Sequence, residues 1–250
     1  MNLNNKRAFI TGGTKGIGAA IALDLARQGC DVAINSRHDD DDARTVKREI
    51  EAADRKCELI LGDVARPGEA TRAVEYAASQ LGGLDVLVHS AGGPAPGTIE
   101  QCPPDEWHAA FDVHVNAAYY LCRAALPLFR QQGEGAIVLV SSVAGIRGVP
   151  GAIAYATVKG AILQFTRSLA RDLADDNIRV NCVAPGIIRT RFHERMTPEA
   201  QAHNLADRIP LHREGTANNV AEAVRLLVTN EFITGETIVV DGGMSMQVCR

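Results

Sequence analysis

The stretch Ala8-Phe-Ile-Thr-Gly-Gly-Thr-Lys-Gly-Ile-Gly18 joins a short apolar run to a glycine-rich turn that opens a helical pattern. The run Ala8–Ile10 predicts a strand, and Gly16–Gln28 predicts a helix. Glycines at such a junction let the backbone approach a pyrophosphate, and the helix start offers free N–H groups and the positive end of its dipole. The spacing of Gly12, Gly16 and Gly18 is G-x-x-x-G-x-G. In this context the pattern indicates dinucleotide binding, with tight strand-to-helix packing as the alternative.

The rest of the chain repeats this order of strand and helix. Six further apolar runs of strand length are Asp31–Asn35, Glu58–Leu61, Asp85–His89, Ala136–Val140, Arg179–Val183 and Thr237–Val240. Helical patterns lie between them at Asp42–Asp54, Pro67–Leu81, Asp105–Gln131, Ile153–Asp175 and Ala217–Thr229. Such alternation predicts an α/β protein with one doubly wound, parallel Rossmann sheet of about seven strands, flanked by helices, with residues 1–250 as a single domain.

Composition and charge exclude several classes of function. The 250 residues are 46% hydrophobic and carry a net charge of -4, so no strong positive field favours nucleic acid or an anionic membrane. The chain lacks a signal-peptide pattern and any apolar run long enough to span a bilayer, which predicts a cytoplasmic protein. Its seven histidines are dispersed without paired metal-ligand spacing, so no metal site is expected. Buried, reduced thiols are expected of the six scattered cysteines, Cys30, Cys57, Cys102, Cys122, Cys182 and Cys249.

A tyrosine and a lysine one helical turn apart form the candidate reactive pair. Tyr155 and Lys159 are four residues apart, so both side chains would lie on one helix face. A nearby ammonium favours a phenolate and lowers the pKa of a phenol, as acid/base catalysis at a carbonyl or carbinol requires. Ser142 follows the run ending at Val140, at the strand end where open α/β sheets bind ligands.

The end of the second predicted strand bears on the choice of cofactor. It reads Asn35-Ser36-Arg37, with no acid before Asp39, and Lys15 lies in the glycine turn. Two cations can clamp a 2′-phosphate, which favours NADP(H) and leaves NAD(H) possible; the alternative is that both are solvated surface residues. The aspartates 39–42 are expected to cap the next helix, and would weaken the preference if they pointed at the phosphate.

Together these residues resemble the short-chain dehydrogenase/reductase superfamily, and in particular its branch of 3-oxoacyl-carrier-protein reductases and glucose dehydrogenases. The resemblance covers essentially the whole chain. It is carried by Thr11-Gly-x-x-x-Gly-Ile-Gly18, Asp63-Val64, Ala91-Gly92, Asn116, Ser142, Tyr155-x-x-x-Lys159, Pro185-Gly186 with Thr190, and Asp241-Gly-Gly243. Order and spacing agree throughout, including the thirteen residues from Ser142 to Tyr155.

The resemblance implies a role for each matching residue. Tyr155 is then the general acid in carbonyl reduction and the base in the reverse direction. Lys159 lowers the pKa of the phenol and holds the nicotinamide ribose, Ser142 binds the reacting oxygen, and Asn116 supports a water relay near Lys159. The implied cofactor-binding residues are Gly12, Thr14, Lys15, Gly16, Ile17, Gly18, Arg37, Asp63, Val64, Ser90, Ala91, Gly92, Tyr155, Lys159, Pro185, Gly186, Ile188 and Thr190.

Two of these positions need comment. Asp63 could accept a hydrogen bond from the adenine amino group, or could only stabilise its own turn. The family usually has Asn-Asn-Ala-Gly after the fourth strand, where this chain has His89-Ser90-Ala91-Gly92. Ser90 has less reach than asparagine, which puts the rigidity around the central strands in question, with little effect expected on the chemistry.

Substrate specificity is expected from Gly93–Gly97, Val143–Gly148 and Gly186–Gly215, the last as a possible lid. That segment mixes apolar and basic residues: Ile187, Ile188, Phe192 and Met196 beside Arg189, Arg191, Arg195 and His193. A 3-oxoacyl-carrier-protein reductase would need a basic docking surface. Glu134 and Asp175-Asp176 argue mildly against one.

Two rival functions remain open. One is an NAD-dependent dehydrogenase of sugars, polyols or other small alcohols, and the other is a catalytically silent dinucleotide-binding sensor. An intact Ser142, Tyr155 and Lys159 argue against the sensor, because binding a cofactor does not need the phenol. The resemblance also implies a homotetramer that pairs the Asp105–Gln131 and Ile153–Asp175 helices between subunits.

Overall fold

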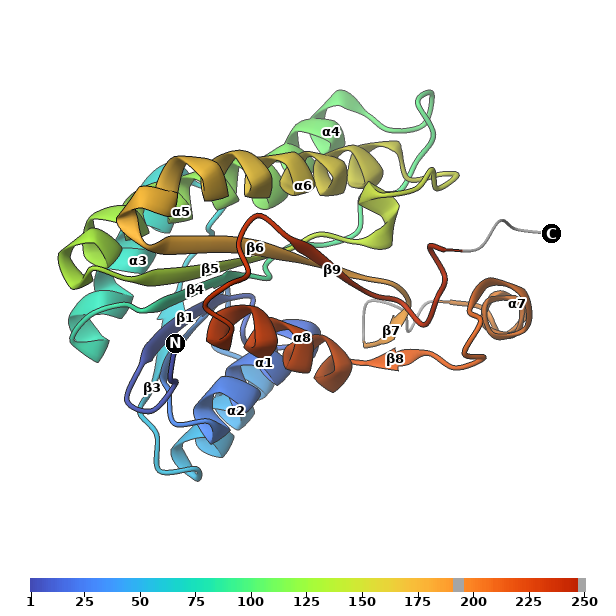
Figure 1. The fold of residues 1–250 in the computed structure, drawn as a ribbon. Coiled ribbons are helices and arrows are strands. Elements are labelled where there is room, and N and C mark those ends of the chain that lie inside the picture. Colours follow the sequence, from blue (N-terminus) through green and yellow to red (C-terminus); the bar gives the residue numbers. More distant parts are fainter. Residues whose placement is uncertain (191–195, 247–250) are drawn as a thin grey trace.

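A computed structural model describes residues 1–190 and 196–246 and contains one parallel sheet of seven strands (Figure 1). The strand order is β3-β2-β1-β4-β5-β6-β9, and every pairing is parallel. This confirms the predicted fold class. The strands are β1 (Arg7–Thr11), β2 (Asp31–Ser36), β3 (Cys57–Leu61), β4 (Val86–His89), β5 (Gly135–Val140), β6 (Ile178–Pro185) and β9 (Thr237–Val240).

Helices cover both faces of the sheet, as the doubly wound order requires. Figure 1 shows one group of helices on each side of the strands. One face carries α1 (Gly16–Arg27), α2 (Asp41–Glu51) and α8 (Ala217–Thr229). The other carries α3 (Pro67–Leu81), α4 (Pro104–Phe111), α5 (Ala117–Gln132) and α6 (Ile153–Leu173).

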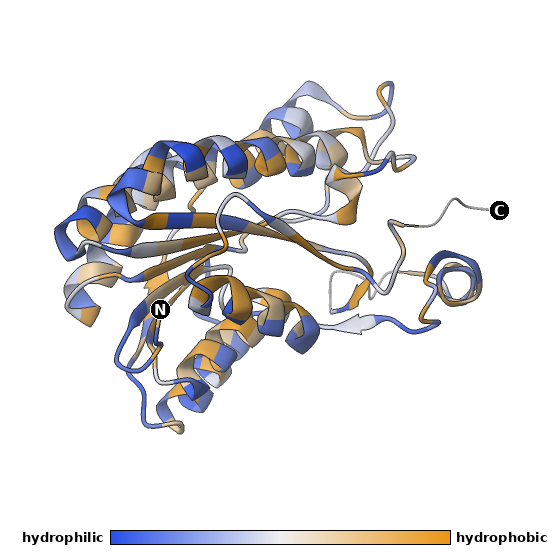
Figure 2. Ribbon diagram, in the orientation of Figure 1, coloured by the Kyte–Doolittle hydropathy of each residue, from blue (hydrophilic) through white to orange (hydrophobic). Residues whose placement is uncertain are grey.

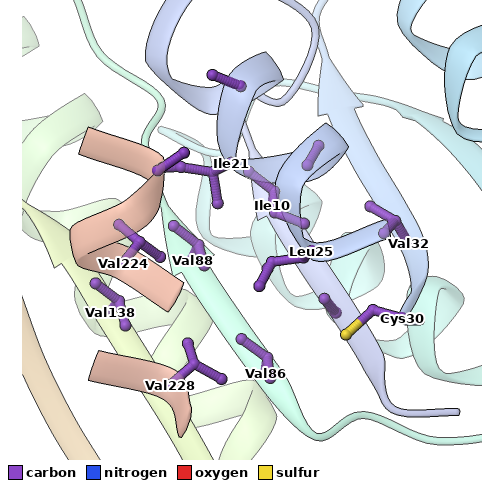
Figure 3. Packing of buried hydrophobic residues seen from close by; sticks show 14 of the residues in the cluster. Ile10, Ile21, Leu25, Cys30, Val32, Val86, Val88, Val138, Val224 and Val228 are labelled. Carbon is purple, nitrogen blue, oxygen red and sulfur yellow. The ribbon is translucent and has the colours of Figure 1, made fainter. Parts of the chain in front are cut away.

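Side-chain alternation along the strands divides the core between the two faces. Val86 and Val88 of β4 pack against α1 and α8, whereas Leu87 between them packs towards α3 and α5. Figure 2 shows the apolar colours on the strands and on the inward helix faces, and Figure 3 shows Ile21 and Leu25 of α1 near Val224 and Val228 of α8. Strands buried on both faces explain why the sequence shows continuous apolar runs.

The strand order places the ligand site. The chain winds outward from β1 through β2 to β3, and outward from β4 through β5 and β6 in the other direction. Loops leaving β1 and β4 therefore diverge to opposite faces of the sheet. A crevice opens at the carboxyl ends of such strands, and the glycine turn follows β1 there.

The predicted Asp105–Gln131 helix is interrupted. A π-helical turn, Asp112–Asn116, separates α4 from α5. Helical periodicity does not register an inserted residue of this kind, because the residues on both sides still repeat at helical spacing.

The irregular segment Gly186–Gly215 contains short elements that the sequence analysis missed. They are β7 (Ile188–Arg189), α7 (Pro198–His203), a second π-helical turn (Asn204–Arg208) and β8 (Gly215–Thr216), which pairs with β7. Two-residue strands and single-turn helices are too short for a period to be visible. Phe192, His193, Arg191 and Arg195 of the expected lid, and Cys249, lie outside the described residues.

Cys30, Cys57, Cys122 and Cys182 are buried free thiols, whereas Cys102 is only partly buried. Across the described ranges, no helix combines the length and apolarity needed to cross a membrane.

Replacing Ile21 by alanine tests the packing of α1 against the sheet. Ile21 is fully buried, so the deletion removes buried methyl groups and leaves a cavity. The expected loss is about 2–5 kcal/mol in the free energy of unfolding, measured by urea denaturation. The same substitution at Ile99, which is 78% exposed, should cost less than about 0.5 kcal/mol. Equal losses at the two positions would contradict the described core.

Candidate active site

A cavity of about 980 Å³ lies at the carboxyl ends of the strands. It extends from Arg37 beyond β2, past the glycine turn, to Tyr155 and Lys159 on α6. The structure therefore brings the candidate binding turn and the candidate reactive pair to a single cavity, although about 140 residues separate them in sequence.

The glycine turn forms a cradle that side chains would fill. Gly12 has a φ of +62°, and a Cβ there would approach the backbone of Ala91 to 2.9 Å. A Cβ on Gly18 would lie 2.2 Å from the carbonyl oxygen of Gly12. Lys15 precedes α1 without a side-chain cap on that helix. Tight glycines beside an uncapped helix start are the arrangement that fits a dinucleotide pyrophosphate.

Lys15, at the far end of the cavity, is held by carboxylates. Its Nζ lies 2.6 Å from Asp40 Oδ2 and 3.3 Å from Asp42 Oδ2, and the hydrogen bond that Lys15 donates to Asp40 raises the pKa of Lys15. Asp40 also caps α2, because its Oδ1 accepts from Ala43 N at 3.0 Å. The expected helix cap is therefore present, and the same aspartate engages one of the two proposed phosphate cations. Arg37 is exposed and lines the cavity beside it.

Asp63 lines the cavity and also stabilises its own turn. Its Oδ1 accepts from Ala65 N at 3.1 Å, and its backbone N–H donates to Glu69. The turn-stabilising role that the sequence left open is thus present.

Ser142 and Tyr155 meet where β5 ends. Ser142 Oγ accepts from Ala144 N at 3.2 Å and caps the short 3₁₀ turn Val143–Gly145. Ser142 also hydrogen-bonds the Tyr155 phenol. Lys159 Nζ donates to the Val140 carbonyl at 2.8 Å and lies 5.6 Å from the centre of the Tyr155 ring.

The pKa of Tyr155 differs from the expectation. Burial raises it above the ordinary phenol value, and the hydrogen bond with Ser142 opposes the rise without cancelling it. Burial also lowers the pKa of Lys159 to about 8, so this ammonium is itself costly to keep charged. Its Nζ donates to a strand carbonyl, and its presence beside the ring does not reverse the rise in the pKa of Tyr155 that burial causes.

His89 supplies hydrogen bonds that hold the central strands together, a role that the shorter Ser90 was not expected to fill. The Val113 carbonyl can only accept, so His89 Nε2, 3.1 Å away, carries the ring proton. His89 Nδ1 then accepts from the Thr11 hydroxyl at 2.8 Å, and Thr11 Oγ1 accepts from the backbone N–H groups of Ser90 and Ala91. The end of β1, the end of β4 and the π-helix are thus tied together, and burial keeps His89 neutral by lowering its pKa to about 4.

The structure does not bring Asn116 to the cavity. Its Nδ2 donates to Asp112 Oδ1 at 2.8 Å within the π-helix, and Asn116 is not among the lining residues. His114 of the same π-helix lines the cavity instead, edge-on to Tyr155 with ring centres 5.8 Å apart. His114 was not predicted as a site residue, because the π-helical turn decides which of these side chains faces the cavity.

All other predicted site residues line this cavity. They are Gly12, Thr14, Lys15, Gly16, Ile17, Gly18, Arg37, Asp63, Val64, Ser90, Ala91, Gly92, Ser142, Tyr155, Lys159, Pro185, Gly186, Ile188 and Thr190. The three expected specificity segments also reach it, through Gly93, Val143 with Ala144, and Ile187, Met196, Asn204 and Arg208. Among the described residues no cluster of three or more candidate metal ligands occurs.

Comparisons with known proteins find relatives that match nearly the whole chain. A family model described as Enoyl-(Acyl carrier protein) reductase matches residues 12–245. The chain is 34% identical, over 244 residues, to the 3-oxoacyl-[acyl-carrier-protein] reductase of Staphylococcus epidermidis, covering 97% of this chain and 100% of that protein. It is 36% identical to general stress protein 39 of Bacillus subtilis over 244 residues, covering 96% and 85% of the two chains.

Solved structures match over the whole length. A short chain dehydrogenase from Burkholderia cenocepacia in complex with NADP has a TM-score of 0.91 and 35% identity, covering 98% of this chain and 99% of that one. L-sorbose reductase from Gluconobacter frateurii, complexed with NADPH and L-sorbose, has a TM-score of 0.90 and 28% identity, covering 99% and 100%.

The burial of Lys159 predicts a pH dependence of stability. Its pKa falls from 10.5 to about 8 on folding, so between these values the unfolded chain binds more protons at this site than the folded chain. The contribution of Lys159 to stability therefore rises as pH rises from about 8 to 10.5. The unfolding free energy of the wild type minus that of Lys159→Met should increase across this window in cofactor-free protein. A difference independent of pH would contradict the burial of a charged Lys159.

Proposed function

This chain belongs to the short-chain dehydrogenase/reductase superfamily, in its 3-oxoacyl-carrier-protein reductase-like branch, and we propose that it reduces a carbonyl to a secondary alcohol with Tyr155 as the general acid, with NADP(H) favoured over NAD(H). One observation carries the proposal. The glycine cradle and the group formed by Ser142, Tyr155 and Lys159 open into the same cavity.

The protein residues divide the chemistry between them. A bound NADP(H) supplies hydride to the carbonyl carbon or accepts it from the carbinol. Tyr155 gives its proton to the carbonyl oxygen in reduction and takes it back in oxidation. Ser142 hydrogen-bonds that oxygen, and the Lys159 ammonium stabilises the phenolate that remains. The raised pKa of Tyr155 keeps the phenol protonated at neutral pH, which suits reduction.

The charges at the far end of the cavity support the cofactor preference. Lys15 and Arg37 lie where the second strand ends, the position that distinguishes a ribose 2′-phosphate from a hydroxyl. Relatives solved with NADP or NADPH match essentially the whole chain. Asp40 moderates the preference, because a phosphate must compete with it for Lys15.

Two substrate classes are supported by different observations. Several relatives are 3-oxoacyl-[acyl-carrier-protein] reductases, whereas one structural neighbour is an L-sorbose reductase complexed with L-sorbose. The exposed Asp175 beside α6 argues mildly against a carrier-protein docking surface, whereas the neighbouring Asp176 is paired with Arg130 at 2.8 Å and adds little to that argument. We therefore favour a small ketone over a carrier-bound thioester.

A homotetramer is part of the proposal. Some apolar side chains of α5 and α6 are not fully buried within the chain: Tyr119 is exposed, and Tyr120 and Phe165 are partly buried. These are the helices that the family resemblance pairs between subunits.

Replacing Tyr155 by phenylalanine tests the proton transfer. Loss of the hydroxyl should lower kcat by about 10²–10⁴, with the Kd for NADPH within about threefold of wild type. The measurement is cofactor absorbance over a panel containing a 3-oxoacyl thioester, ketoses and simple ketones. A wild type that binds NADPH but reduces none of them, with Tyr155→Phe behaving identically, would favour the catalytically silent sensor.

Two substitutions test the cofactor preference in opposite directions. Arg37→Ala should raise the KM for NADPH about tenfold or more and leave that for NADH nearly unchanged.

Asp40→Asn keeps the helix cap but removes a charge that competes for Lys15, so the KM for NADPH should fall by about two- to fivefold. Asp41→Asn is the control, because Asp41 directly follows Asp40 as the first residue of α2 and its side chain is fully exposed. Equal changes in the KM for NADPH and in the KM for NADH would contradict binding of the 2′-phosphate by Arg37 and Lys15.

A further inference from the structure

His114 is a buried titratable group beside the reacting phenol that the proposed chemistry does not use. It lies on the π-helical turn Asp112–Asn116 and is 3% exposed. Histidine at an apolar wall is often only a satisfied core residue. His114 differs because its ring is in contact with both the Tyr155 ring and the glycine wall of the cavity.

The hydrogen bonding of His114 fixes its proton. Nε2 lies 3.1 Å from the Gly93 carbonyl oxygen, which can only accept, so Nε2 is the donor and carries the proton. In the neutral ring Nδ1 then has none. The imidazole is therefore held in one orientation by the backbone that follows β4.

The space around the ring is equally restrictive. A Cβ on Gly92 would lie 2.2 Å from His114 Cε1 and 2.6 Å from Nδ1, so the imidazole occupies the place that a side chain at Gly92 would take. The ring also meets Tyr155 at 82°, an edge-to-face arrangement. The imidazole therefore fills space that adjoins both the Gly92–Gly93 backbone and the phenol.

The charge state of the ring also matters. The charged or titratable groups near it are Lys159 and Tyr155 from α6, His89 from β4 and the exposed Asp112 on its own turn. Burial, with the nearby Lys159 ammonium, lowers the pKa of His114 to about 2. A neutral ring supports the phenol without adding a second cation to compete with Lys159.

We propose that His114 is a positioning residue that braces the Tyr155 phenol against the Gly92–Gly93 wall and keeps water from the phenol ring. Ser142 hydrogen-bonds the hydroxyl, and His114 limits movement of the ring. The brace matters for turnover only if the proposed function holds, but its effect on the Tyr155 proton is measurable without any substrate.

The primary test is a spectrophotometric titration of Tyr155. Tyrosinate absorbance is followed with pH in wild type and in His114→Ala, each after subtraction of the same protein carrying Tyr155→Phe, which removes the signal of the other three tyrosines. Opening the gap to water solvates the phenolate, so the pKa of Tyr155 should fall by about 0.5 or more in His114→Ala. His114→Gln, whose amide can still donate to Gly93, should restore a value close to wild type.

His108→Ala is the matched control. His108 lies on α4, six residues before His114, but it is exposed and does not line the cavity. It should leave the pKa of Tyr155 unchanged. If His114→Ala does not fold, His114→Ser leaves similar room and should shift the pKa in the same direction. An unchanged pKa in the folded small-residue variant, or an equal shift in His108→Ala, would overturn the proposal.

Kinetics supply a second, separable readout. With a substrate from the carbonyl panel, His114→Ala should lower kcat about tenfold or more, with the Kd for NADPH within about threefold, because the glycine cradle is untouched. A merely structural role would weaken NADPH binding and turnover together. If the wild type reduces no carbonyl, the proposed function fails, while the titration still decides whether His114 braces the phenol.

Discussion

The site depends on the hydrogen bonds that fasten α6 to the end of β5. Lys159 Nζ donates to the Val140 carbonyl at 2.8 Å, and Ser141 Oγ donates to the Lys159 carbonyl at 2.7 Å. Gly145 completes the junction, since a Cβ there would lie 2.5 Å from the Lys159 carbonyl carbon. These contacts set the rotation of α6 relative to the sheet. Tyr155, one turn earlier, consequently meets Ser142 at the strand end.

The electrostatic design of this junction is a buried cation among neutral groups. Among the described lining residues, the carboxylates belong to Asp40, Asp63 and Asp112. None of these offsets the burial of Lys159, whose pKa is lowered to about 8. A buried ammonium without a close carboxylate is costly. The phenolate that forms when Tyr155 gives up its proton would offset that cost. The Lys159 ammonium therefore favours the phenolate over the phenol.

Much of the fold and of the candidate site could be predicted from the sequence, because both depend on hydrophobic periodicity and on the placement of glycines. Buried parallel strands and amphipathic helices leave a pattern, and all but one of the predicted site residues reach one cavity. Asn116 does not line the cavity, because a π-helical insertion rotates the following side chains without changing their spacing. The support from His89 was missed because it depends on three elements that meet only in the fold. The raised pKa of Tyr155 arises from burial, which the Tyr-x-x-x-Lys spacing does not report.

The central claim is that one cavity holds both the dinucleotide and the reactive phenol. A crystal structure of the protein with NADPH tests it most directly. The account predicts the pyrophosphate over the glycine turn, the 2′-phosphate near Arg37, and the nicotinamide ring beside the Tyr155 hydroxyl. A nicotinamide ring bound away from Tyr155, or a phenol turned out of the cavity when the dinucleotide is in place, would contradict it.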